Sequence, residues 1–139
     1  MLYFGYSQLT RSADEKLAAE GLGRAHHRAL YFIARHPNLT VSQLLALLAI
    51  TKQSLGRVIN DLTAHGLIES RAGDRDRRQR LLRLTPGGQQ LEGELFDLVR
   101  LKLSRAYTSA GQDCVTGFWT VLERLIATSE VPTSAIVKG

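Results

Sequence analysis

Residues 50–85 constrain the fold of this chain more than any other segment does. In the first half of the segment, apolar residues recur three and four positions apart, which predicts a short amphipathic helix. The apolar stripe of this helix consists of Leu55, Val58, Ile59 and Leu62. The helix is expected to end near His65-Gly66, and two short strands follow at 67–71 and 79–84. The segment is therefore a helix that runs directly into a hairpin with an arginine-rich tip.

A second short helix precedes this segment. Thr40 is suited to cap it, because Gln43 stands three residues later and completes a capping box. Its apolar stripe consists of Val41, Leu44, Leu45 and Leu48. Ala49 and Ile50 then turn the chain, and Thr51 caps the following helix. Two short helices joined by so tight a turn can bury both stripes only if they cross steeply, which is the geometry of a helix-turn-helix.

Longer helices flank the helix-turn-helix on both sides. Helical periodicity predicts them at 1–19, 24–35 and 86–107, with a last helix after Gly111. Thr85-Pro86 marks one of these starts, because a capping hydroxyl precedes a proline at the first helical position. The tail from Val131 is expected to be frayed. The predicted fold is mainly α with a small β-hairpin wing: a winged helix-turn-helix between N-terminal and C-terminal helices.

The composition is that of one globular domain. The chain has 139 residues, of which 44% are hydrophobic, so it can bury a core. Cys114 is the only cysteine, which excludes an intramolecular disulfide and favours a reducing compartment; we expect it to be a packing residue. No apolar run reaches the roughly 18–20 residues needed to cross a bilayer, and no signal-peptide pattern is present. These features predict a cytoplasmic, soluble protein without a membrane partner.

The basic charge is concentrated at the hairpin. The formal net charge is +5, which by itself favours an anionic partner only weakly. Within 71–80, however, five arginines stand against two aspartates. There is no Ser-His-Asp arrangement, phosphate loop or paired-carboxylate site, and the four histidines have no consistent partner in the sequence. We therefore expect no enzyme activity, no cofactor and no bound metal.

The exposed face of the helix after the tight turn carries side chains suited to reading DNA. With its apolar stripe turned inward, this helix presents Thr51, Lys52, Gln53, Ser54 and Arg57 near its N-terminal end. Gln and Arg have the paired donors and acceptors that match adenine and guanine edges in the major groove. The free N–H groups of a helix N-terminus also attract phosphate. The alternative is an ordinary surface helix, which carries the same residue types.

The loop of the hairpin is suited to the minor groove. Arg75, Arg77 and Arg78 supply positive charge, and the negative potential of DNA is concentrated where that groove is narrow. Asp76 has the opposite sign, but a carboxylate can hold a guanidinium in a fixed orientation. We therefore expect Asp76 to orient Arg78. The alternative is a solvent-exposed network of ion pairs, which would contribute little energy.

Two stretches of the sequence resemble the MarR family of transcriptional regulators. They are I-T-K-Q-S-L, beginning at Ile50, and D-R-R-Q-R-L-L-R-L-T-P-G-G, beginning at Asp76. The resemblance extends over nearly the whole chain. In the family's wing an aspartate is followed by any residue and an arginine, and nine positions later by a threonine after leucine. Here these positions are Asp76, Arg78 and Leu84-Thr85. The resemblance implies that Arg78 enters the minor groove, braced by Asp76.

The resemblance also implies a homodimer that binds double-stranded DNA at a near-palindromic operator, as a repressor. It divides the single domain, 1–139, into a winged helix-turn-helix lobe at 22–85 and a dimerisation region at 1–20 and 86–130. The first helix starts at residue 1, so any preceding arm is expected to be missing. Dimerisation is also reasonable physically, because a pair of recognition helices doubles the sequence that is read. The terminal helices carry apolar residues beyond the needs of a small core, namely Tyr3, Phe4, Phe96, Phe118 and Trp119.

Members of the family often sense a small-molecule effector in a cleft between the dimerisation helices and the DNA-binding lobe. The residues that could line such a cleft here are Tyr6, His26, His27 and Tyr31. Adjacent histidines face different directions on a helix, so His26 and His27 do not form a chelating pair. A structural or surface role is the alternative for them, and the sequence identifies no inducer.

A different class of function remains open beside DNA binding. A winged helix can also be a protein-interaction module, in which the basic hairpin binds an acidic partner. A steep loss of DNA affinity with salt, together with a sequence preference, would favour DNA over an acidic protein as the partner. The reason is that DNA binding releases counterions in proportion to the phosphates neutralised.

Overall fold

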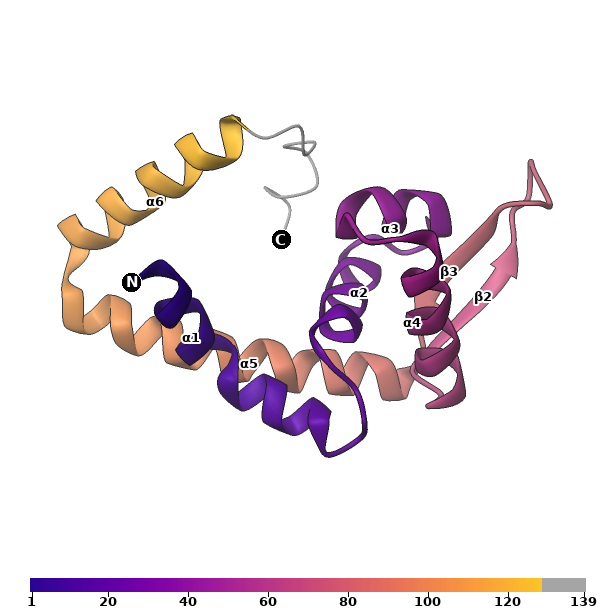
Figure 1. Ribbon diagram of the computed structural model, residues 1–139, viewed down its shortest axis with the longest axis horizontal. Helices are drawn as coiled ribbons and strands as arrows, with labels where there is room; N and C mark the ends of the chain where they lie inside the picture. The colour runs from indigo at the N-terminus through magenta and orange to yellow at the C-terminus, as the bar shows by residue number, and fades with distance from the viewer. Residues whose placement is uncertain (129–139) are drawn as a thin grey trace.

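The computed structural model describes residues 1–128, so the fraying expected from Val131 and the end of the 86–130 region lie outside the described residues. Residues 1–128 form six helices and three short strands (Figure 1). In chain order these are α1 (Leu2–Ala18), α2 (Arg24–Arg35), β1 (Leu39–Thr40), α3 (Val41–Leu48), α4 (Lys52–Ala64), β2 (Ile68–Ala72), β3 (Arg80–Leu84), α5 (Pro86–Ala110) and α6 (Gln112–Ala127). The predicted fold class, mainly α with a small hairpin, is confirmed.

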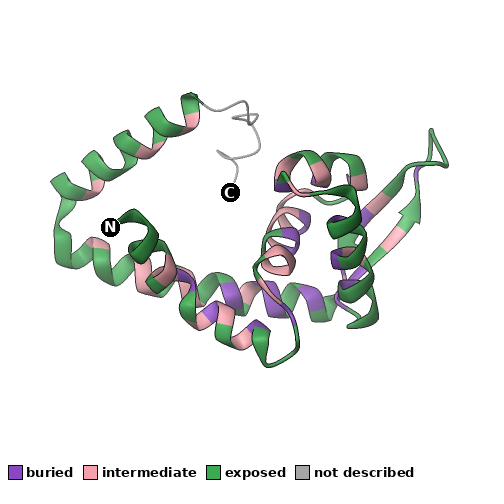
Figure 2. Ribbon diagram, viewed as in Figure 1, coloured by how far each residue is buried: buried purple, intermediate pink, exposed green. Residues whose placement is uncertain are grey.

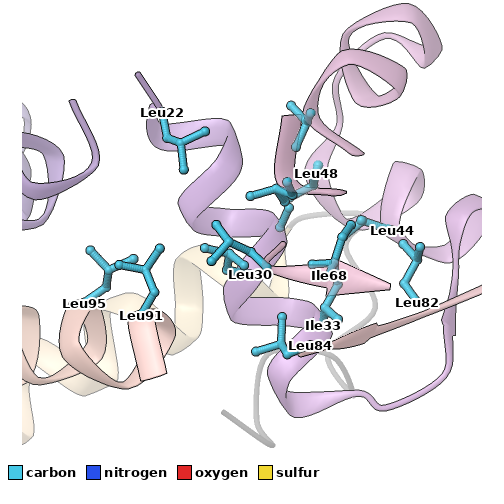
Figure 3. Packing of buried hydrophobic residues seen from close by; sticks show 14 of the residues in the cluster. Leu22, Leu30, Ile33, Leu44, Leu48, Ile68, Leu82, Leu84, Leu91 and Leu95 are labelled. Carbon is cyan, nitrogen blue, oxygen red and sulfur yellow. The ribbon is translucent and has the colours of Figure 1, made fainter. Parts of the chain in front are cut away.

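The main core lies between α2, α3, α4 and the sheet, and α5 closes it from one side (Figure 2, Figure 3). Its fully buried side chains include Leu30, Ile33, Leu44 and Leu82. Burying one such side chain contributes about 2 kcal/mol through the hydrophobic effect. The predicted stripes of α3 and α4 are fully buried along their centres, whereas Leu45 and Ile59 at their margins are only partly buried. These two short helices therefore depend on the shared core for their stability.

Hydroxyl caps hold the starts of α3 and α4, as the sequence predicts. The N–H of Gln43 donates to Thr40 Oγ1 at 3.1 Å, and Gln43 Oε1 accepts from the Thr40 N–H at 3.0 Å, which completes the capping box. Thr51 caps α4 through a single bond of this kind, in which its Oγ1 accepts from the N–H of Ser54. Between the two caps, Ala49 adopts the left-handed conformation, with φ of 51°. This conformation is strained for any residue with a Cβ, and it makes the reversal between the helices short.

The sheet contains one strand that the sequence does not predict. β1 pairs with β3 in antiparallel orientation, with Leu39 opposite Leu82. β3 also pairs with β2, so the order is β1-β3-β2. Two residues are too few to show an alternating pattern, which explains why β1 was not expected. The pairing anchors the base of the hairpin to the start of α3.

The junction between β3 and α5 depends on a close backbone approach. Thr85 Oγ1 donates to the Gly66 carbonyl at 2.6 Å and accepts from the Gly88 N–H at 3.1 Å, so it caps α5 and ties it to the end of α4. A Cβ on Gly88 would overlap the carbonyl oxygen of Leu67. Only glycine allows this contact. The start of α5 is consequently fixed against the base of the hairpin.

Outside the lobe, α1 packs along α5, and α6 follows α5 after a break at Gly111, where φ is 90° (Figure 1). No residue of α6 is buried within the part of the chain that the structure describes, and the helix turns back from the end of α5 that is distant from the lobe (Figure 2). None of the helices of residues 1–128 has both the length and the apolarity needed to cross a membrane.

Candidate nucleic-acid interface

The N-terminal half of α4 presents a polar face to solvent. Leu55, Val58 and Leu62 are buried, and the residues that alternate with them on the opposite side are exposed. The exposed set consists of Lys52, Gln53, Ser54, Gly56 and Arg57. No heavy atom comes within 4 Å of a Cβ built on Gly56, so the helix surface is open at that position. The side chains of Gln53 and Arg57 are free to reach a ligand that lies along α4.

Thr51 and Ser54 are engaged in the cap of α4. The N–H of Ser54 donates to Thr51 Oγ1 at 3.1 Å, and the Thr51 hydroxyl donates to Ser54 Oγ at 2.8 Å. Both side chains are exposed nonetheless, next to the free N–H groups of the first turn. A phosphate oxygen bound there would meet the positive end of the helix dipole.

The hairpin contains two groups of arginines that differ in their partners. Along the strands, three arginines are bound by neighbouring side chains: Arg71 pairs with Asp74 at 3.1 Å, Arg80 donates to Ser70 Oγ at 2.6 Å, and Arg83 pairs with Glu69 at 2.5 Å. At the tip, Arg75, Arg77 and Arg78 are exposed, and their side chains have no partner among residues 1–128. The bound arginines stiffen the ribbon, and the free arginines are available to an anion.

Asp76 contributes to the tip in a way that differs from the prediction. Its Oδ1 accepts from the backbone N–H of Arg78 at 3.0 Å, and no ion pair joins it to the guanidinium of Arg78 in the described chain. The expectation that the carboxylate holds that guanidinium is therefore corrected: Asp76 fixes the backbone of the loop. The Asp76 carbonyl also accepts from the N–H of Gln79 at 3.1 Å, and a Cβ on Gly73 would clash with that carbonyl. The loop is tightly folded, so the tip arginines project from a defined backbone.

The hairpin projects well beyond the rest of the lobe, on the side where β2 packs beside α4 (Figure 1). A ligand that contacts both the exposed face of α4 and the tip must be elongated. The tip carries three unpaired guanidinium groups, and α4 adds the ammonium group of Lys52 and the guanidinium of Arg57, so such a ligand should also be anionic. A nucleic-acid duplex has both properties.

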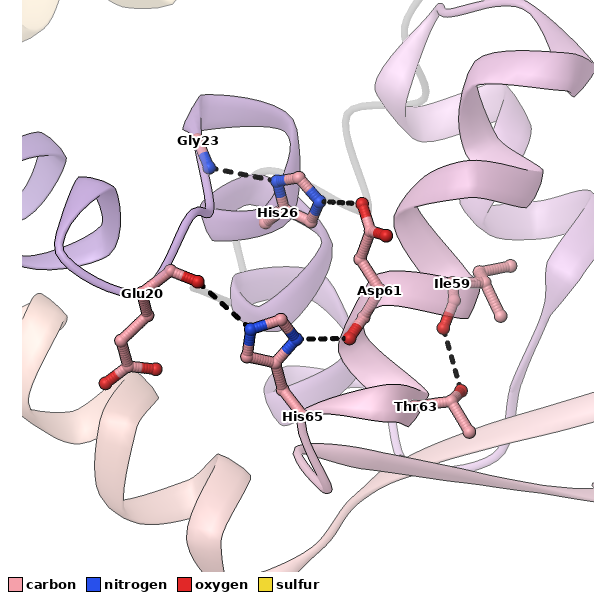
Figure 4. A network of polar contacts seen from close by, with 7 residues as sticks. All are labelled: Glu20, Gly23, His26, Ile59, Asp61, Thr63 and His65. Carbon is pink, nitrogen blue, oxygen red and sulfur yellow. Dashed lines mark hydrogen bonds and ion pairs between the residues drawn. The ribbon is translucent and has the colours of Figure 1, made fainter.

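The C-terminal end of α4 is bound to the rest of the molecule through contacts around Asp61 (Figure 4). His26 Nε2 lies 2.9 Å from Asp61 Oδ2, and His65 Nδ1 lies 2.7 Å from the Asp61 carbonyl oxygen. His65 Nε2 lies 3.0 Å from the carbonyl oxygen of Glu20. The expectation that the histidines have no consistent partner is therefore wrong for His26 and His65. The sequence could not reveal the contacts of His26 with Asp61 and of His65 with Glu20, because these partners come from different elements.

A largely buried ion pair links α2 of the lobe to α5. Arg35 Nη1 donates to Glu92 Oε1 at 2.7 Å, and the Arg35 guanidinium stacks 3.7 Å from the Tyr31 ring and 5.1 Å from the Phe96 ring. His27 lies in the same region. Burial lowers the pKa of His27, although the nearby carboxylates of Asp14 and Glu92 oppose that shift. This cluster is the main polar contact between the lobe and the long helix.

In the described part of the chain, the four residues predicted to line an effector cleft lie in three different surroundings. Tyr6 lines an apolar groove of about 680 Å³ between α1, α5 and α6, together with Tyr107 and Trp119. His26 is bound to Asp61, whereas His27 and Tyr31 belong to the Arg35 cluster.

Cys114 is exposed near the start of α6, so the expectation that it is a packing residue within the chain is wrong. Among residues 1–128, no three His, Cys, Asp or Glu side chains gather closely enough to hold a metal ion.

The fold and its exposed basic face define a winged helix-turn-helix protein. Residues 20–79 match the model of the MarR family. The HTH-type transcriptional regulator PetP of Rhodobacter capsulatus is 46% identical over 125 residues, which span 90% of this chain and 75% of that protein. The chain belongs to the MarR family of transcriptional regulators.

Solved structures share the fold at low sequence identity. Streptococcus pneumoniae FabT in complex with DNA has a TM-score of 0.81 at 18% identity and covers 91% of this chain and 90% of its own. A mutant MarR from E. coli complexed with operator DNA has a TM-score of 0.71 at 22% identity, with 89% of each chain covered. A MarR family regulator from Silicibacter pomeroyi has a TM-score of 0.74 at 22% identity, covering 91% of this chain and 86% of its own.

Proposed function

We propose that this protein is a sequence-specific transcriptional repressor that binds a near-palindromic operator as a homodimer. α4 enters the major groove, and the hairpin tip enters the adjacent minor groove. The observation that carries the proposal is the free state of the tip arginines on a stiffened ribbon beside an open, polar face of α4. FabT and MarR, which share the fold, have been solved in complex with DNA, and this supports DNA as the ligand.

Within α4, the roles follow from chemistry and position. Gln53 and Arg57 contact base edges, since their donors and acceptors match adenine and guanine. Lys52 contacts a phosphate as a point charge. Thr51 and Ser54 receive a phosphate at the first turn, where the free N–H groups lie beside their hydroxyls.

In the hairpin, Arg78 enters the minor groove and Arg75 and Arg77 contact the flanking phosphates. Asp76 supports Arg78 through its backbone N–H, so the carboxylate sets the direction in which that residue leaves the loop. Narrow, A·T-rich minor grooves attract arginine most strongly, because their negative potential is greatest. The operator should therefore be A·T-rich at the positions that face the tip.

The dimer divides the single domain, 1–139, between two tasks. Residues 22–85 form the DNA-binding lobe, and 1–20 with 86–130 form the dimerisation region. The exposed apolar side chains of α1, α5 and α6 support this division, and among them are Leu2, Phe4, Leu101, Phe118, Trp119 and Leu125. In a dimer of this kind the two recognition helices read half-sites about one helical turn of DNA apart, roughly 34–36 Å.

A small-molecule effector is a further element of this proposal. The groove beside Tyr6 is apolar and large enough for a small ligand, so Tyr6 is the one predicted effector residue that a groove ligand would touch. His26, His27 and Tyr31 would respond to it only through movement of α2. A regulator of this kind acts on the chromosome, which places it in the cytoplasm.

The decisive experiment selects bound sequences from random DNA and then measures affinity over a range of salt concentrations. A repressor of this kind enriches a near-palindrome, and its affinity falls steeply with salt. Gln53→Ala should relax base preference, whereas the neighbouring Lys52→Ala should weaken all sequences alike and reduce the salt slope by about 1. If no DNA sequence is enriched and the protein binds an acidic protein instead, it is an interaction module and not a DNA-binding regulator.

A further inference from the structure

The two histidines around Asp61 make contacts that require different protonation states (Figure 4). The Gly23 N–H donates to His26 Nδ1 at 3.0 Å, so this nitrogen accepts. His26 Nε2 then carries the hydrogen and donates to Asp61 Oδ2 at 2.9 Å. A neutral imidazole has one donor and one acceptor, so the neutral ring of His26 satisfies both contacts.

His65 faces two acceptors. Its Nδ1 lies 2.7 Å from the carbonyl oxygen of Asp61, and its Nε2 lies 3.0 Å from the carbonyl oxygen of Glu20. A carbonyl oxygen cannot donate, so both ring nitrogens must carry hydrogen for both contacts to form. Only the imidazolium has two N–H groups. The geometry around His65 therefore selects the charged ring.

The charged groups around His65 favour the same state. His65 is the residue that ends α4, where the unpaired carbonyls of the helix attract a cation. The ionisable groups that face it are the carboxylates of Asp61 on α4 and of Glu20 in the turn after α1. Hydrogen bonds to the carbonyls of Asp61 and Glu20 raise the pKa of His65, and the attraction of the two carboxylates adds to this.

We propose that His65 is a positioning residue that, when protonated, ties the end of α4 to the turn between α1 and α2 and thereby strengthens operator binding. When the proton is lost, one of the two carbonyls loses its donor and the tie to Glu20 or to Asp61 opens. α4 is then less firmly held against α1 and α2 at the end opposite to its DNA-reading turn. The inference rests on the proposed function, because it concerns how the recognition helix is held.

The sign of the pH effect follows from the raised pKa of His65. The contribution of the imidazolium is complete below the ordinary histidine value of about 6.5 and is lost as pH rises through the higher folded value. Lysine and arginine do not change charge in this range, so the basic DNA-binding face itself stays constant. Operator affinity should therefore decrease as pH rises from about 6 to about 8.5.

The test combines ring NMR with operator binding, using the full chain. In the wild-type protein, the ¹⁵N shifts of His65 should show two protonated ring nitrogens at about pH 6. Affinity for the selected operator should fall about two- to fivefold by about pH 8.5, the size typical of an exposed charged contact. His65→Gln, which does not titrate, should give a flat profile. His36→Gln, which removes a histidine at the end of α2, should keep the wild-type profile.

The outcomes separate this proposal from the proposed function. A single protonated nitrogen on His65 at about pH 6, or a His65→Gln profile equal to that of the wild type, would overturn the role of His65 alone. Absence of binding to any DNA by every variant would overturn the proposed function, and the positioning role in operator binding with it. In that case the NMR spectrum still reports whether the imidazolium exists.

Discussion

The helix-turn-helix lobe and the α1–α6 end of the molecule differ in how their apolar residues are covered. In the lobe, Leu44, Leu62 and Leu82 are 0% exposed, so one chain encloses its own core. In α6, Phe118 remains 40% exposed and Trp119 51% exposed. The lobe is therefore complete within a single chain, whereas the opposite end presents apolar surface that favours a second chain.

The two regions meet through α5, and their contact is polar as well as apolar. The Arg35–Glu92 ion pair lies largely buried between α2 and α5, and the Arg35 guanidinium stacks on Tyr31. Breaking a buried pair leaves one charge without a partner, which is strongly destabilising. A shift of α5 in a dimer should therefore move α2 with it, and α2 in turn holds α4 through His26.

The largest expected effect is on the stability of the lobe. Leu62→Ala removes a fully buried side chain from α4 and should lower the free energy of unfolding by about 2–5 kcal/mol. The matched control is Leu125→Ala, where the leucine is 54% exposed on α6. Urea unfolding at two protein concentrations distinguishes them. The free energy of unfolding that Leu62→Ala removes should be the same at both protein concentrations. A loss that changes with protein concentration would contradict a self-contained lobe.

The next effect concerns the opposite end of the molecule. Trp119→Ala should weaken dimerisation by about 2 kcal/mol or more, roughly 30-fold in the dissociation constant, because exposed tryptophans are frequent interface hot spots. Sedimentation equilibrium measures the change directly. Glu123→Ala on the same helix should leave dimerisation nearly unchanged. If both variants behave like the wild type, the apolar end serves some purpose other than dimerisation.

The third prediction separates DNA binding from assembly. Arg78→Ala should lower operator affinity by about 1–3 kcal/mol while the dimer mass and the unfolding transition stay unchanged. Arg83→Ala is the control, since that arginine is bound to Glu69 on the ribbon. Arg83→Ala should lower operator affinity less than Arg78→Ala does. Equal affinity of the wild type and Arg78→Ala would remove the hairpin from the mechanism.

The features that the sequence predicts well are those set by neighbours in the chain. The caps at Thr40, Thr51 and Thr85 each involve an N–H three residues away, so the sequence contains both partners within one turn. The helical stripes follow from the same short-range periodicity. β1 was missed because its stability comes from pairing Leu39 with Leu82, far along the chain.

The polar contacts of the candidate site were harder to predict for the same reason. Asp61 joins His26 from 35 positions away, and Arg35 joins Glu92 from 57 positions away. Nothing in the local sequence selects one carboxylate over another for such pairs. At the hairpin tip, Asp76 binds the backbone N–H of Arg78 instead of its guanidinium, because that N–H lies nearer than the flexible side chain.

A smaller effect on stability is expected at Ala49, in the turn between α3 and α4. Ala49→Gly should raise the free energy of unfolding by about 1 kcal/mol, because it relieves a left-handed residue that carries a Cβ. Ala46→Gly, in the interior of α3, should lower the free energy of unfolding by about 1 kcal/mol. Thermal unfolding of the pair gives the comparison. The same sign for both substitutions would mean that Ala49 is not strained in solution.

The smallest expected effect arises where the two regions meet. Burial lowers the pKa of His27 below the ordinary value of 6.5, so the unfolded chain takes up this proton more readily than the folded one. Stability should consequently be greatest above pH 6.5 and decrease as pH falls below it. His65 acts in the opposite direction, so the measurement is the difference in melting temperature between the wild type and His27→Gln at about pH 5 and about pH 7.5. The wild type should lose more stability on acidification than the variant. If the two proteins respond equally, His27 is open to solvent, and α2 packs less closely against α1 and α5 than the lowered pKa requires.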